Sequence, residues 1–179
     1  MMKKTINILT AAILLIITSS CMGNKLEQSY NNQESKIDKY IEGKGEEFRS
    51  LRNGGANRVV MVEGEGEELG KNGFISFYYA GYTFSGNFSK SNLFVTNHKQ
   101  TAEDAQWNLS DEEFQIMELN MSDARLTQGL RDGLLGVKAG EECEILFTGK
   151  YGFGNKSFGI IPANSAQLWK IWVVGVSND

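Results

Sequence analysis

The sequence predicts an α+β domain, in which an antiparallel β-sheet lies against one short α-helix. The first observation is a series of about six short runs rich in β-branched and aromatic residues, separated by turns. The second is a single short helix-like run near the middle of the domain, at residues 124–136. The chain contains no internal repeat and no low-complexity tract. This pattern indicates a fold class but names no function.

The first 21 residues have the organisation of a secretory signal that ends in a cysteine. A basic start is followed by a short apolar run at 11–17, and small residues then lead directly into Cys21. Because the apolar run is too short to cross a bilayer as a helix, it predicts a signal peptide over 1–20. The cysteine after small residues resembles the lipobox of bacterial lipoproteins, although Thr18 stands where leucine is usual.

This resemblance implies that Cys21 carries a lipid and holds the mature chain to a membrane of the bacterial cell envelope, with the outer membrane favoured. Two questions stay open: whether the protein faces the periplasm or the outside, and whether it is instead an ordinary secreted protein with an unmodified cysteine.

The segment after Cys21 predicts a linker and then a small helical extension. Residues 21–33 are polar without apolar periodicity, which predicts a flexible lipidated tether. Residues 34–49 carry apolar side chains at helical spacing, which predicts a short amphipathic helix that packs on the domain or, alternatively, on a partner. Residues 51–57 are expected to form a loop. Together, 34–57 form an N-terminal extension ahead of a domain at 58–179.

Composition excludes several classes of function. The chain has 179 residues, 41% of them apolar, and a net charge of −4. Loss of Lys3 and Lys4 with the signal peptide takes the charge to about −6. This acidic balance, with no basic cluster, argues against nucleic acid as a partner. One histidine and two cysteines offer no metal-ligand spacing, and the acidic GEGEELG of 64–70 would repel a phosphate, so no cofactor is expected.

The strands of the domain are predicted from apolar and β-branched runs between turns. Gly81 lies inside the most aromatic run and marks a bulge or a close approach of another group. The segment 98–109 is expected to be a helix or a loop. The expected strands are 58–62, 74–84, 88–96 as its hairpin partner, 115–120, 142–148 and 166–176.

Several short motifs resemble the FK506-binding-protein (FKBP) family of peptidyl-prolyl cis-trans isomerases. Their order and spacing carry the resemblance, which covers about 58–176; residues 97–121 look like an insertion near the pocket rim. The matching pieces are Gly129, Gly133, Gly140-Glu141, Tyr151-Gly152-Phe153-Gly154, Ile160-Ile161-Pro162, the turn Glu63-Gly64-Glu65-Gly66, Phe77-Tyr78-Tyr79-Ala80-Gly81 and Leu93-Phe94-Val95-Thr96-Asn97.

The resemblance implies a sheet wrapped around one short helix, isomerase activity on X-Pro peptide bonds, and a pocket that binds prolyl segments of client proteins. Without it, each of these residues would be read as ordinary core. The backbone N–H of Thr127 would donate to the substrate carbonyl. The implied pocket walls are Tyr79, Phe94, Leu126, Thr127, Leu130, Phe153, Ile161 and Trp169.

Three positions depart from the family pattern and leave the function open. Leu130 stands in place of a tryptophan, Val95 in place of an aspartate, and Phe153 in place of a tyrosine. The first reading is a prolyl isomerase that assists folding of envelope or secreted proteins. The alternatives are a binding or chaperone domain of the same fold without useful turnover, and a purely structural lipoprotein.

Three further residues have simpler readings. Cys143 is expected to be a buried thiol within a strand. His98 is expected at the surface. Trp107 is expected either at the pocket rim or, preferably, packed within the insertion.

Overall fold

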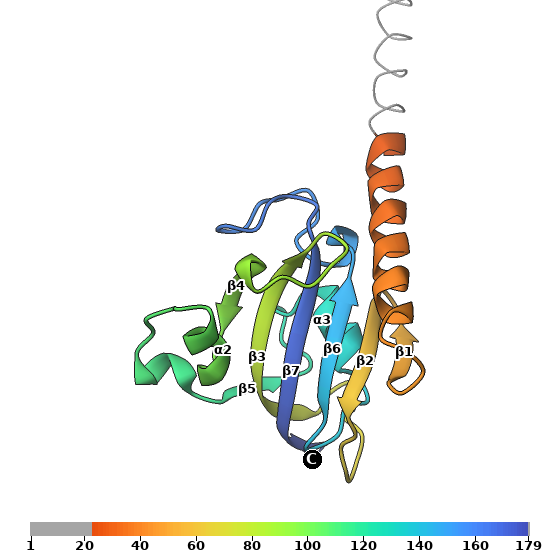
Figure 1. The fold of residues 1–179 in the computed structure, drawn as a ribbon. Helices are drawn as coiled ribbons and strands as arrows, with labels where there is room; N and C mark the ends of the chain where they lie inside the picture. The colour runs from red at the N-terminus through yellow and green to blue at the C-terminus, as the bar shows by residue number, and fades with distance from the viewer. Residues whose placement is uncertain (1–22, 179) are drawn as a thin grey trace, which may run out of the picture. The chain divides into compact units, whose positions relative to one another are not determined.

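The computed structural model describes residues 23–178, and its domain is built on one seven-stranded antiparallel sheet. Figure 1 shows the strands side by side, with α3 crossing one face of the sheet. The order across the sheet is β1-β2-β6-β7-β3-β4, and β5 also pairs with β3. The bounds are β1 Arg49–Asn53, β2 Ala56–Val62, β3 Phe74–Phe84, β4 Leu93–Thr96, β5 Met117–Asn120, β6 Glu142–Phe147 and β7 Ala166–Ser177. The α+β class predicted from the sequence is confirmed.

The central strands bury both faces of the sheet, and their side chains alternate between two cores. On β7, Ile171 and Val173 belong to one core, whereas Ala166 and Leu168 belong to the other. A strand buried on both faces carries apolar side chains at nearly every position. This explains why 166–176 reads as one almost continuous apolar run.

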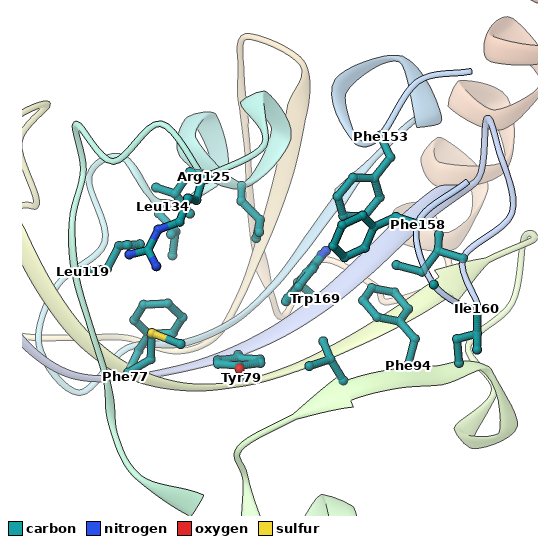
Figure 2. A pocket seen from close by; sticks show the side chains of 16 residues that line it. Phe77, Tyr79, Phe94, Leu119, Arg125, Leu134, Phe153, Phe158, Ile160 and Trp169 are labelled. Atoms are coloured by element: carbon teal, nitrogen blue, oxygen red, sulfur yellow. The ribbon is translucent and has the colours of Figure 1, made fainter. Parts of the chain in front are cut away.

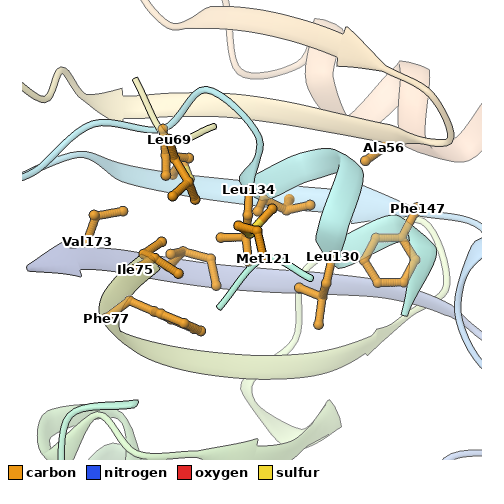
Figure 3. Close-up of a cluster of buried hydrophobic side chains, with 13 residues drawn as sticks. Ala56, Leu69, Ile75, Phe77, Met121, Leu130, Leu134, Phe147 and Val173 are labelled. Carbon is orange, nitrogen blue, oxygen red and sulfur yellow. The ribbon is translucent and has the colours of Figure 1, made fainter. Parts of the chain in front are cut away.

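One core lies between the sheet and α3 (Gln128–Leu134) (Figure 3). Leu130 and Leu134 extend from this helix into the core, and Leu134 is fully buried. The helix can lie this close because it turns glycines toward β6. A Cβ on Gly129 would come within 2.3 Å of the Phe147 ring, and one on Gly133 within 2.2 Å of Ile145 Cγ2.

The opposite core is covered by helical segments that include residues 33–42 and α2 (Lys99–Asp104). Ile37 is fully buried there, and Tyr40 and Ile41 pack beside it. Tyr40 also donates its hydroxyl to Glu144 on β6 at 2.9 Å. The prediction that this amphipathic segment packs within the chain is therefore confirmed.

Two predictions for the N-terminal part were wrong. Residues 23–42 are helical throughout, including the stretch to 33 that was predicted as a flexible tether. No glycine or proline interrupts 24–42, so the backbone can continue as a helix in spite of its polar sequence. The helix also ends earlier than predicted, because Gly43 follows it and residues from 49 onward enter the sheet.

The predicted loop at 51–57 is a β-hairpin instead. β1 and β2 pair from Arg49↔Val60 to Asn53↔Ala56, with Gly54 and Gly55 as the two-residue turn. The Gly-Gly turn is a hairpin signal in the sequence, but the flanking residues are polar. β1 is an edge strand exposed on both sides, so it lacks the apolar alternation by which strands are recognised.

The remaining elements lie where the sequence predicts them, within a few residues. β4 pairs antiparallel with β3 and confirms the expected hairpin, with η1 (Lys90–Asn92) in the connection. Within the segment 97–121, α2 and η2 (Asp111–Phe114) precede β5. After β6, η3 (Gly149–Tyr151) opens the long loop that leads to β7.

Candidate active site

A pocket of about 560 Å³ opens between α3, the concave side of β3 and β7, and the loop before β7 (Figure 2). Its walls are almost entirely aliphatic and aromatic. An apolar concavity of this size is the usual form of a small-ligand or peptide site. The lining residues are Phe77, Tyr79, Phe94, Val95, Met117, Leu119, Arg125, Leu126, Leu130, Leu134, Phe153, Phe158, Gly159, Ile160, Ile161 and Trp169.

Three aromatic rings from neighbouring strands form the sheet side of the pocket. Trp169 lies 5.4 Å from Phe94 in an edge-on arrangement and 5.9 Å from Tyr79, centroid to centroid. Phe94 reaches this position across Gly81, where a Cβ would lie 2.8 Å from the Phe94 ring. The register of β3 and β4 also shifts at Gly81. Gly81 is thus both the bulge and the close approach expected from the sequence.

The indole of Trp169 is fixed by a buried amide two residues earlier on the same strand. Trp169 Nε1 donates to Gln167 Oε1 at 2.9 Å, and Gln167 is fully buried. Because the indole N–H is already paired, Trp169 presents a carbon surface to the pocket. The hydrogen bond also limits rotation of the ring.

The roof loop, residues 149–165, supplies the wall opposite the sheet. Phe153 and Phe158 stack at 4.7 Å with an angle of 11° between their rings. Phe158 and Ile160 are 63% and 75% exposed, so much of their apolar surface faces the pocket mouth and solvent. Ile161 is buried at the base of the same wall. Figure 2 shows Phe153, Phe158 and Ile160 gathered on one side of the site.

The inner end of the pocket is made by core residues. Leu130 and Leu134 approach from α3, and Phe77 from β3. All three are buried, which means that the pocket reaches into the main core. Leu130 is smaller than the tryptophan that the resemblance would place there, and this allows the pocket to extend as far as Leu134.

Arg125 is the one charged side chain among these lining residues of the described chain. Its guanidinium contacts Asp123, with Nη2 to Oδ2 at 2.6 Å, and is otherwise exposed. The hydrogen bonds from Arg125 lower the pKa of Asp123 to about 2, so this carboxylate is ionised at neutral pH. Arg125 lies at the end of the pocket opposite Phe153, Phe158 and Ile160 (Figure 2).

Seven of the eight pocket residues predicted from the sequence lie around this pocket: Tyr79, Phe94, Leu126, Leu130, Phe153, Ile161 and Trp169. Thr127 is not among the lining side chains and forms the N-cap of α3 instead. Within residues 23–178, no protein group accepts from its backbone N–H. The predicted donor is therefore unpaired, next to the lining residue Leu126.

Sequence reasoning missed several lining residues. Two of them could have been found from spacing. Phe77 lies two residues before Tyr79 and therefore on the same face of β3, and Leu134 lies four residues after Leu130 and therefore on the same face of α3. The same period of two links Met117 and Leu119 on β5, but this strand lies in the segment read as an insertion. Nothing in the sequence pattern singles out Phe158, which lies in an irregular loop.

The other residue predictions have mixed outcomes. Cys143 is a free, buried thiol, as predicted, and burial raises its pKa. Trp107 packs against the core on the opposite face of the sheet and does not line the pocket. His98, expected at the surface, is only partly exposed. Its ring stacks on Trp172 at 4.0 Å, and burial lowers its pKa.

Other classes of site are not formed by the described residues. Between residues 23 and 178, no three acidic, cysteine or histidine side chains gather as metal ligands would. No helix in this part of the chain is both long and apolar enough to cross a bilayer. Cys21 and the signal peptide lie outside the described residues.

The fold and the pocket define a class of domain with an apolar pocket beside a short helix. Comparison with known proteins identifies the class. Residues 66–174 match the family model of FKBP-type peptidyl-prolyl cis-trans isomerases, and the chain belongs to this family. The match confirms both the resemblance and the enzyme class expected from the sequence.

A curated relative, FK506-binding protein 1 of Aspergillus oryzae, is 20% identical over 69% of this chain and 99% of its own length. Solved structures share the fold at low identity. The crystal structure of FkpA from Escherichia coli has a TM-score of 0.59 at 17% identity and covers 94% of this chain and 70% of that one. The three FKBP domains of wheat FKBP73 give a TM-score of 0.58 at 19% identity over 74% of this chain, which spans 52% of the wheat chain.

Proposed function

We propose that the pocket binds X-Pro segments of client proteins and accelerates rotation about the prolyl amide. The observation that carries this proposal is the pocket itself, walled by Tyr79, Phe94 and Trp169 in a chain of the FKBP family. A prolyl ring is apolar and compact, and an aromatic cavity removes it from water. The rest of the peptide would lie across the mouth, between the roof loop and Arg125.

The proposed chemistry requires no nucleophile, metal or acid. The planar amide is polar, and the barrier to rotation between its cis and trans isomers is about 20 kcal/mol. The twisted transition state has lost the amide resonance and is less polar. An apolar pocket disfavours the polar planar form relative to the twisted one. The lower barrier follows from this differential stabilisation.

One backbone group can hold the substrate. The unpaired Thr127 N–H at the start of α3 is the proposed donor to a substrate carbonyl. A donor at a helix N-terminus favours an acceptor that carries partial negative charge. This contact would orient the peptide, while the rings hold proline.

A binding function without useful turnover is the second candidate, and the polarity of the walls favours it. Val95 and Phe153 both line the pocket and offer no hydrogen bond. A site with fewer fixed donors grips apolar surface but distinguishes the twisted amide less well from the planar one. In this case the protein would act as a chaperone for apolar or proline-containing segments.

Isomerisation rates on a panel of X-Pro tetrapeptides, with and without FK506, test the proposal. The protein should lack the signal peptide. Acceleration that FK506 abolishes is the expected result. Peptide binding without acceleration would support the binding domain, and neither binding nor acceleration would leave only a structural role.

We also propose that the protein acts in the bacterial cell envelope, anchored by lipid at Cys21, and assists folding of envelope or secreted clients. The sequence MMKKTINILTAAILLIITSSC supports this proposal. Labelling of cells with a radioactive fatty acid is the test. Label should enter the wild-type protein and be absent from Cys21→Ser, and equal labelling of the two would refute the anchor.

A further inference from the structure

The two ends of the roof loop are held by one side chain from the N-terminal helix. Gly149 N donates to Gln33 Oε1 at 2.8 Å, and Gln33 Nε2 donates to Asn164 O at 2.7 Å. The two loop residues lie 116 and 131 residues after Gln33. A single amide thus bridges the beginning and the end of the loop that carries Phe153 and Phe158.

Gln33 lies on the face of the helix that packs on the domain. Ile37 and Ile41 follow it at intervals of four residues, and this spacing puts all three side chains on one face. Ile37 is fully buried, and Tyr40 is bonded to Glu144, so the helix is held at this place. A polar amide on a packed face needs hydrogen-bond partners, and Gly149 and Asn164 supply them.

The ends of the loop are crowded. Asn164 has a φ of 59°, a conformation that few non-glycine residues adopt. A Cβ on Gly149 would lie 2.4 Å from the Asn164 carbonyl carbon, so the two backbones touch. The loop also bonds within itself, from Gly154 N to Gly149 O at 2.9 Å and from Asn164 N to Gly154 O. The Gln33 amide ties this crossing to the N-terminal helix.

We propose that Gln33 is a positioning residue for the pocket, holding the roof loop so that its apolar wall stands over the site. This inference rests on the proposed function of the pocket as a peptide site. It makes the helix that carries Gln33 part of the binding machinery, because undocking of this helix would release the loop. By linkage, a ligand that orders the loop also stabilises docking of the helix.

The test compares amide hydrogen exchange and peptide kinetics of the full mature chain with those of Gln33→Met. Methionine keeps the length and apolar packing of the side chain but removes both hydrogen bonds. We expect the amides of Gly149 and Gly154 to exchange about 10-fold faster in the variant. For a Leu-Pro tetrapeptide we expect KM to rise about 3- to 10-fold, with little change in kcat, because the wall is less ordered before binding.

Asn178→Ala is the matched control. Asn178 also bridges two backbone groups with one amide, accepting from Gly70 N at 2.7 Å and donating to Glu68 O at 2.8 Å, but it is not among the pocket residues. It should leave the roof-loop amides and KM unchanged. Gln33→Glu is the conservative variant. It keeps the acceptor for Gly149 and should restore slow exchange of that amide.

The outcomes separate the two proposals. Wild-type exchange of the roof-loop amides in Gln33→Met would overturn the positioning role, whether or not the protein is active. Faster exchange with unchanged KM would also overturn it. Absence of turnover in the wild-type protein would count against the isomerase proposal alone, and the dissociation constant of the same peptide would then replace KM as the readout.

Discussion

Small side chains and one hydrogen bond determine the shape and the polarity of the pocket. Gly81 has no Cβ, and this absence lets the Phe94 ring lie against β3. Leu130 is short, and the pocket continues past it to Leu134. Gln167 accepts the hydrogen bond from the indole N–H of Trp169, which is the only donor of that side chain. Each of these effects makes the site larger or more apolar, and none adds a reactive group.

Phe153→Tyr tests whether turnover is limited by missing hydrogen-bond donors. The resemblance places a tyrosine here, and one hydroxyl contributes about 1 kcal/mol when it finds a partner. We therefore expect kcat/KM on a Leu-Pro tetrapeptide to rise about 3- to 10-fold. Phe74→Tyr is the control, because Phe74 is half exposed and outside the pocket. Equal kinetics of wild type and Phe153→Tyr would mean that a donor at this position does not limit the reaction.

At the scale of elements, α3 is placed by close contact on one side and by a buried charge at its end. Arg58 on β2 donates to the carbonyls of Gly133, Leu135 and Gly136, which close the helix. Its Nε lies 3.4 Å from Glu141, and both side chains are buried. The short helix is therefore held by the sheet rather than by its own length.

The substitution Gly133→Ala should have two opposing effects on stability, through helix propensity and through packing. Alanine gains up to about 1 kcal/mol over glycine in a helix, but its Cβ would meet Ile145 Cγ2, a fully buried side chain with no free space. Overpacking of this kind costs about 1–3 kcal/mol. We expect a net loss of about 1–2 kcal/mol in the urea-derived free energy of unfolding. The exposed Gln128→Ala on the same helix should change it by less than about 0.5 kcal/mol, and a stabilised Gly133→Ala would contradict the packing argument.

Arg58→Met removes the carbonyl contacts of α3 and leaves the Glu141 carboxylate without its cation. Breaking a buried pair in this way costs about 3–5 kcal/mol. Burial already raises the pKa of Glu141, and loss of Arg58 should raise it further. When the folded-state pKa of a carboxyl is raised, the free energy of unfolding falls as the pH rises and the carboxyl ionises. The loss measured by urea unfolding should therefore be smaller at pH 5 than at pH 7.5, and the reverse order would refute this account.

On the scale of the whole molecule, the sheet separates a core that opens into the pocket from one that helical segments cover. An apolar pocket leaves part of its lining exposed to solvent. Burial of that lining therefore adds little to the free energy of unfolding. The opposite side is closed by residues 33–42 and by α2. Trp172 packs against this core, and His98, the only histidine of the chain, stacks on Trp172. This face is expected to contribute to the pH dependence of the free energy of unfolding.

Stability should fall as the pH drops from 7.5 to 5.5, in part because of His98. Burial against Trp172 lowers its folded-state pKa, an effect that Glu142 only partly opposes. Below about pH 6.5, the unfolded chain then binds the proton more readily than the folded one, and this favours unfolding. His98→Phe keeps a ring for stacking but does not titrate. Its free energy of unfolding should change less over this range, and parallel profiles for the two proteins would exclude His98 as the cause.

The sequence predicts what depends on local pattern. Apolar and β-branched runs between turns locate β3, β6 and β7, and the run at 124–136 contains α3. The same pattern fails for β1, because an exposed edge strand has no apolar face, and for 23–33, where a polar segment is helical. Seven of the eight expected pocket residues gather around one cavity, since they lie on elements whose faces the sequence pattern defines.

By itself, the sequence determined the fold class, the family resemblance and the apolar nature of the site, because each follows from residue type and short-range spacing. Only the tertiary structure decided that Phe158 and Ile160 complete the wall, that His98 is stacked, and that Gln33 bridges Gly149 and Asn164. The physical reason is that these contacts join segments far apart in the chain. Irregular loops and single polar side chains show no periodic pattern in the sequence. Their contacts are therefore defined only once the folded sheet has brought the distant segments together.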